Sequence, residues 1–133
     1  MADRQVKLSV DNVQKAFRLR DSDGSHSLLR VLGGVSFEVH TGEIVSLIGE
    51  SGCGKTTLLR IIQGLMTKDG GEVVVDGEVA TGPGRNRGFV FQQATLLPWR
   101  TARQNVEFGM ELMNMSRAER SERALELDRK SVV

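Results

Sequence analysis

Residues 49–57 read G-E-S-G-C-G-K-T-T and form the most informative stretch of this sequence. They fit the phosphate-binding loop pattern G-x-x-x-x-G-K-[ST], in which Gly54 precedes Lys55 and Thr56. Glycines let the backbone bend tightly and approach an anion, so that several N–H groups converge on the same phosphate oxygens. Lys55 adds positive charge for the outer phosphates, and the Thr56 hydroxyl suits a Mg²⁺ ion bound to them. The stretch therefore predicts a nucleotide site; the alternative is a glycine turn between a strand and a helix.

The sequence on either side of this loop has the pattern of a buried strand and an amphipathic helix. Residues 43–48 form a short, mostly apolar run, which is typical of a strand buried on both faces of a sheet. Beyond the loop, large apolar residues recur at helical spacing: Leu58, Ile61, Ile62 and Leu65. A helix that begins at the loop also turns its positive end toward the anion. Strand, glycine loop and helix together predict an α/β fold.

Further segments have strand character, and turn residues separate them. Residues 8–13 alternate as a half-buried strand does, and residues 31–39 resume this character after a polar loop. Asp76-Gly77, between two β-branched runs, is a strong hairpin signal. Residues 88–91 predict one more short apolar strand. We expect the first strands to be antiparallel.

Two helices are predicted near the end of the sequence. Capping-box spacing begins at Thr101 for a helix that reaches about residue 113, and again at Ser116 for a helix that reaches about residue 128. Pro98 disfavours both a helix interior and a central strand, so residues 96–99 predict an ordered loop.

Composition and charge narrow the class of protein. The chain has 133 residues, of which 39% are hydrophobic and 26% charged, as expected for a globular domain or part of one. The net charge of +1 gives no general electrostatic reason to expect a nucleic acid partner. No segment approaches the roughly 20 apolar residues of a membrane-spanning helix. Cys53 is the only cysteine, which excludes an internal disulfide and favours a reducing compartment.

Taken together, these residues resemble the ATP-binding subunit of an ABC transporter. The resemblance implies an α/β P-loop NTPase fold, of which residues 1–133 would be the N-terminal part only. That part would contain an antiparallel β subdomain, the phosphate loop at 49–57 and the start of the helical subdomain at about 99–133. The implied cofactors are ATP and Mg²⁺. The implied nucleotide-binding residues are the loop and one aromatic residue that stacks on adenine: Gly49, Glu50, Ser51, Gly52, Cys53, Gly54, Lys55, Thr56, Thr57 and Phe17.

The same resemblance assigns further roles and partners. Thr56 and Gln92 would bind Mg²⁺, and Gln92 would position the attacking water. Residues 96–100 read L-L-P-W-R and, with residues 105–109, are similar to importers of nitrate, sulfonates or taurine. The loop after Gln92 would contact the membrane subunit of a transporter, and a second ATP-binding subunit would complete the site. The chain would then be cytoplasmic and peripheral to the inner face of the cell membrane.

Several features of the family pattern are absent from this sequence. It contains no L-S-G-G-Q signature, no apolar strand that ends in Asp-Glu, and no histidine after such a strand, because His26 and His40 both precede the loop. Residues 128–133 show no family motif, and we expect a C-terminally truncated domain. Two functions therefore stay open at this stage: the energy-coupling ATPase subunit of an importer, or a truncated, non-hydrolysing nucleotide-binding fragment without a transport role. A small P-loop kinase or GTPase is disfavoured, since no base-reading motif follows Gln92.

Overall fold

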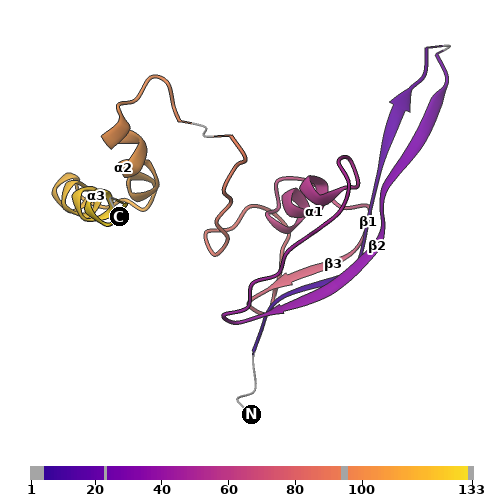
Figure 1. The fold of residues 1–133 in the computed structure, drawn as a ribbon, viewed down its shortest axis with the longest axis horizontal. Helices are drawn as coiled ribbons and strands as arrows, with labels where there is room; N and C mark the ends of the chain where they lie inside the picture. Colours follow the sequence, from indigo (N-terminus) through magenta and orange to yellow (C-terminus); the bar gives the residue numbers. More distant parts are fainter. Residues whose placement is uncertain (1–4, 23, 94–95, 132–133) are drawn as a thin grey trace. The chain divides into compact units, whose positions relative to one another are not determined.

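The computed structural model describes residues 5–22, 24–93 and 96–131. These residues divide into two compact units, one that ends at Phe89 and one that begins at Val90. The first unit contains a four-stranded sheet and the helix α1, and the second contains the helices α2 and α3 (Figure 1).

The sheet of the first unit is antiparallel throughout and has the strand order β2-β1-β3-β4. Strands β1 (Val6–Arg20) and β2 (His26–His40) form a long hairpin, which Figure 1 shows in indigo and purple. Strand β3 (Gly70–Val75) pairs with the other side of β1, and the short β4 (Glu78–Val79) lies beyond it. The prediction of antiparallel first strands is confirmed, although both strands are longer than the alternation indicated.

The turn between β3 and β4 is the hairpin that the sequence predicts. Asp76 and Gly77 both adopt positive φ angles, 54° and 81°. Two consecutive residues with positive φ give a turn whose twist matches that of the strands it joins, and Asp-Gly adopts this conformation readily.

The core of the first unit lies between the sheet and α1 (Lys55–Ile62). The helix is amphipathic, so three of its apolar side chains are buried against apolar residues of three strands. The buried residues of this cluster are Val10, Val13, Leu32, Leu58, Ile61, Ile62, Val73 and Val75. The core thus fixes the start of α1 against the sheet.

Helix α1 ends earlier than its apolar spacing indicates. Gly64 has a φ of 74°, and a Cβ at this position would lie 2.2 Å from the carbonyl group of Gly82. Arg87 secures the same end, because its guanidinium donates to the Ile62 carbonyl oxygen at 2.7 Å and to the Gly82 carbonyl oxygen. Leu65, which continues the helical spacing in the sequence, therefore follows the helix and is 52% exposed.

Two predicted strands are absent from the described structure. Residues 43–48 and 88–91 join none of the described strand ladders. Ile44 is 93% exposed and Ile48 is 94% exposed, so the prediction of a buried strand at 43–48 is wrong. The prediction of a short apolar strand at 88–91 is wrong as well, and Val90 is 95% exposed. The composition of these runs suits a strand, but a strand also requires hydrogen bonds from a neighbouring strand, and none of the four described strands supplies them.

The second unit consists of α2 (Ala102–Leu112) and α3 (Arg117–Ser131). Both predicted capping boxes are present: the Thr101 hydroxyl accepts from the Gln104 N–H, and the Ser116 hydroxyl accepts from the Glu119 N–H. Asn105 fastens the preceding loop to α2, because its side chain accepts from the Leu97 N–H at 2.7 Å. No helix within the described residues is long and apolar enough to cross a membrane.

Candidate nucleotide-binding site

The phosphate loop ends at Gly54, which packs tightly against β2. Gly54 has a φ of 100°, a conformation that side-chain-bearing residues adopt at a cost. A Cβ on Gly54 would lie 2.9 Å from Leu32 Cδ2, 3.0 Å from Val31 Cγ1 and 3.1 Å from the Val31 carbonyl oxygen. The loop can therefore turn into α1 at this position only because the residue is glycine.

The first turn of α1 has unoccupied hydrogen-bonding capacity. Within the described part of the chain, no side chain caps the helix at Gly54, and its first turn contains no acidic residue. The first N–H groups of a helix have no partner inside the helix and carry partial positive charge. Lys55 and Thr56 are the first two residues of the helix, and Thr56 is exposed to solvent. The arrangement suits an anion that accepts several hydrogen bonds at once.

Lys55 folds back across the loop that precedes it. Its ammonium group donates to the carbonyl oxygens of Gly49 at 2.7 Å and Glu50 at 2.6 Å, and it lies 3.5 Å from Cys53 Sγ. These acceptors are neutral, so the positive charge stands over the loop without a compensating carboxylate among the described ion pairs. A phosphate group would meet this charge as well as the open N–H groups of α1.

The remaining loop residues leave the loop open to solvent. Residues 49–53 are all exposed, Thr56 is exposed, and Thr57 is half-buried. Gly49 is constrained by its neighbour, because a Cβ there would lie 2.8 Å from Cys53 Sγ. Glu50 and Ser51 are exposed, and the Glu50 carbonyl oxygen accepts from Lys55. The nucleotide-binding roles of all nine loop residues stay predictions.

Phe17 lies on β1, on the same side of the sheet as the start of α1. Lys15 is the cross-strand partner of Leu32, the residue against which Gly54 packs. Directly opposed residues share a face of the sheet, and so do residues two apart on one strand. Phe17 therefore follows Lys15 by about 7 Å on that face, at a rise of about 3.3 Å per residue. Phe17 is half-buried and lies outside the apolar core cluster.

The structure adds a residue that the sequence did not single out. The Asp69 carboxylate accepts from Lys15 Nζ at 2.8 Å and from the Ala16 N–H at 2.7 Å. The Asp69 N–H donates to the Gln14 carbonyl oxygen at 2.9 Å. The hydrogen bond from Lys15, and then that from Ala16, holds the pKa of the Asp69 carboxyl below its usual value. No local pattern could reveal these contacts, because Asp69 is more than 50 residues from its partners in the sequence.

Gln92 belongs to the second unit, where it is exposed and lies outside any helix or strand. Its predicted contribution to Mg²⁺ binding and water positioning is therefore neither confirmed nor contradicted. The loop residues and Phe17 both lie in the first unit. The role of Gln92 stays a prediction.

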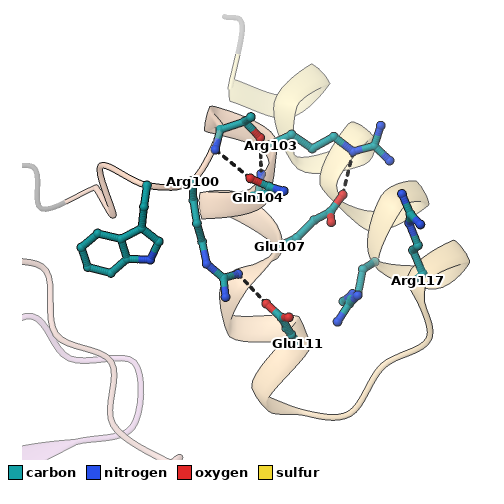
Figure 2. A pocket seen from close by; sticks show the side chains of 9 residues that line it. Arg100, Arg103, Gln104, Glu107, Glu111 and Arg117 are labelled. Carbon is teal, nitrogen blue, oxygen red and sulfur yellow. Dashed lines mark hydrogen bonds and ion pairs between the residues drawn. The ribbon is translucent and has the colours of Figure 1, made fainter.

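The second unit contains a polar cavity of about 560 Å³ between α2 and α3, which Figure 2 shows from close by. Four arginines and two glutamates contribute to its lining: Arg100, Arg103, Arg117, Arg120, Glu107 and Glu111. Arg100 pairs with Glu111, and the same hydrogen bond holds the pKa of the Glu111 carboxyl below its usual value. Arg103 pairs with Glu107 at 2.7 Å. Both ion pairs lie within α2 and the loop before it. A hydrogen bond from the Arg103 guanidinium to the Ser121 hydroxyl joins α2 to α3. Among the described residues of this unit, Ala124 is the only buried apolar one.

Comparison with known proteins identifies the class. The family model described as ABC transporter matches residues 32–132, and the chain belongs to this family. A solved dimeric ATP-binding cassette, in a post-hydrolysis state with ADP and Pi, superimposes with a TM-score of 0.75 at 34% identity, and the match covers 90% of this chain and 54% of that one. The fold is thus a partial ABC ATP-binding domain, as the sequence predicted.

The chain is also similar to three relatives of known or assigned sequence family. An uncharacterized ABC transporter ATP-binding protein of Methanocaldococcus jannaschii is 46% identical, over 89% of this chain and 42% of the relative. The nitrate import ATP-binding protein NrtD of Synechocystis sp. is 48% identical, over 76% of this chain and 38% of the relative. The taurine import ATP-binding protein TauB of Yersinia pestis is 46% identical, over 70% of this chain and 36% of the relative. The chain spans about two fifths of the length of these relatives.

Proposed function

We propose that this chain binds ATP together with Mg²⁺ and supplies the phosphate-binding part of the energy-coupling subunit of an ABC-type importer. One observation carries the proposal: an open glycine loop presents the uncapped start of α1 and an ammonium group whose described acceptors are neutral. Each of these features favours a polyanion, and the order in which they follow one another is that of a phosphate loop.

The chemistry of each residue follows from its position. On binding, the Lys55 ammonium exchanges its carbonyl acceptors for phosphate oxygens, which form stronger hydrogen bonds because they are charged. The Thr56 hydroxyl and the Gln92 amide oxygen are hard oxygen donors of the kind that Mg²⁺ accepts, so they are the residues that would hold the ion. The ion would neutralise charge that develops on the phosphates. Phe17 offers an aromatic face for the adenine.

The transported substrate and the partners belong to the same proposal. Nitrate and taurine importers are among the similar proteins, so we propose a small anion or sulfonate as substrate of the complete transporter. A second ATP-binding subunit and a membrane subunit would be partners, the latter through the loop after Gln92. This places the chain at the inner face of the cell membrane. The alternative is a truncated, non-hydrolysing nucleotide-binding fragment without a transport role.

Calorimetric titration with Mg-ATP tests the nucleotide site. Lys55→Ala removes a charge that is desolvated against the phosphates, and such losses cost about 2 to 5 kcal/mol. We therefore expect an affinity at least about 30-fold weaker than that of the wild type, since 1.4 kcal/mol is a factor of ten. Lys68→Ala, which removes the same charge from the same unit, is the matched control. Equal ATP affinity in wild type and Lys55→Ala would refute the proposal.

A further inference from the structure

Asp69 lies where the β1–β3 ladder ends. The last pair of this ladder joins Gln14 to Gly70, so β3 supplies no partner for the residues of β1 that follow. The Asp69 carboxylate takes the place of that partner, because it accepts from the Ala16 N–H at 2.7 Å. Its own N–H donates to the Gln14 carbonyl oxygen at 2.9 Å. Asp69 thus binds the backbone of β1 on both sides of Lys15.

The same carboxylate also fixes the Lys15 side chain beside Phe17. Lys15 Nζ donates to Asp69 Oδ1 at 2.8 Å, and only 11% of the Lys15 side chain is exposed. The ammonium group lies over the Phe17 ring, 5.7 Å from its centroid. A cation at this distance is attracted to the face of an aromatic ring, so it favours one orientation of Phe17. Lys15 then occupies one face of the ring, so a base would stack on the opposite face.

We propose that Asp69 is a positioning residue for Phe17, and that through Lys15 and Ala16 it determines how strongly the site favours a nucleotide over a bare polyphosphate. This inference rests on the proposed function, because it assumes that the phosphate loop and Phe17 bind the same ligand. Without Asp69, Lys15 would be free to leave the ring, and the adjacent backbone of β1 would lose an anchor. The stacking surface would then be poorly ordered while the phosphate loop stayed intact.

Two ligands separate the base from the phosphates in the test. Mg-ATP engages both parts of the site, and inorganic tripolyphosphate with Mg²⁺ engages the loop alone. For Asp69→Ala we expect ATP affinity to fall by a factor between about 3 and 150, where the upper limit is the full loss of a stacked base. We expect tripolyphosphate affinity to stay within about twofold of the wild-type value, because the described hydrogen bonds of Asp69 go to Gln14, Lys15 and Ala16 and not to the phosphate loop. Asp69→Asn keeps an acceptor for Ala16 and should lie between the wild type and Asp69→Ala.

Asp76→Asn is the matched control, since Asp76 also pairs with a lysine of β1, Lys7, at the far end of the strand. It should change neither affinity. In a Phe17→Ala background, Asp69→Ala should cause little further loss of ATP affinity, because Asp69 acts through the ring. A purely structural role would weaken both ligands equally and would persist without Phe17.

The outcomes are distinct. Equal losses for both ligands, or no loss for either, would overturn the role of Asp69. If tripolyphosphate does not bind the wild type and Lys55→Ala leaves ATP affinity unchanged, the proposed function itself fails. If Asp69→Ala does not fold, which circular dichroism would show, the Asp69→Asn variant decides by the same two affinities.

Discussion

Replacement of Gly54 by alanine isolates the physical requirement for glycine at the start of α1. At a φ of 100° an alanine strains the backbone by about 1 to 2 kcal/mol. The added Cβ would also lie 2.9 to 3.1 Å from atoms of Val31 and Leu32, one of them a backbone oxygen that cannot move aside cheaply. Overpacking of this kind costs about 1 to 3 kcal/mol, so Gly54→Ala should lose about 2 to 5 kcal/mol in total.

Gly52→Ala is the matched control for this change. Gly52 also has a positive φ, 85°, but a Cβ there would meet nothing within 4 Å. It should therefore lose only the backbone part, about 1 to 2 kcal/mol. Thermal unfolding of the nucleotide-free chain, followed by circular dichroism, measures the difference. At about 4 to 8 °C per kcal/mol, Gly54→Ala should melt at least about 4 °C below Gly52→Ala. Equal melting temperatures would show that the contact with β2 does not constrain the loop.

Three further predictions concern other parts of the chain. Thr101→Ala removes a capping-box hydroxyl from α2 and should destabilise this helix by about 0.5 to 2 kcal/mol, which denaturant unfolding followed by far-ultraviolet circular dichroism would measure. The hydrogen bond from Arg100 lowers the pKa of the Glu111 carboxyl in the folded chain, so this ion pair stabilises α2 and the loop before it at pH values above the ordinary pKa of 4.5. This stabilisation is lost as the pH falls through the lowered pKa. Glu111→Gln should accordingly lose less helix content than the wild type when the pH is lowered from neutral to acid. The same loss of helix content in both proteins would contradict this prediction. Ile44→Lys with Ile48→Lys should reduce the binding of a hydrophobic dye, because both side chains are more than 90% exposed, and unchanged dye fluorescence would show that they are covered in solution.

The elements that the sequence predicted correctly are those whose determinants lie within a few residues. The Asp76-Gly77 hairpin, the capping box at Thr101 and the start of α1 at the phosphate loop each depend on a short pattern and its neighbours. Such patterns act through backbone conformation and local hydrogen bonds, which do not depend on the rest of the chain. For the same reason nine residues suffice to predict a phosphate loop.

The errors arose where structure depends on distant partners. Residues 43–48 have the composition of a buried strand, but no described strand pairs with them, and Ile44 and Ile48 are exposed. The composition of a segment indicates which side chains a strand would bury, but it does not show whether a neighbouring strand is present to pair with it. Asp69 illustrates the opposite case, since a single aspartate in a glycine-rich turn gives no local sign of its bonds to Lys15 and Ala16.

An irregularity of the β1–β2 ladder links the two parts of the candidate site. Lys15 pairs with Leu32 and Ala16 pairs with Arg30, so Val31 is an additional residue on β2. In a regular strand Val31 and Leu32 would point to opposite faces, whereas a bulge redirects side chains, and both residues lie against Gly54. Asp69 binds β1 at the same level, on the side away from β2. One short section of β1 is thus fixed from both sides. The bulge at Val31, against which Gly54 packs, lies on one side of it, and the Asp69 carboxylate binds it on the other. A change of register there by one residue would move Phe17 to the opposite face of the sheet, so the section against which Gly54 packs also determines the face on which Phe17 lies.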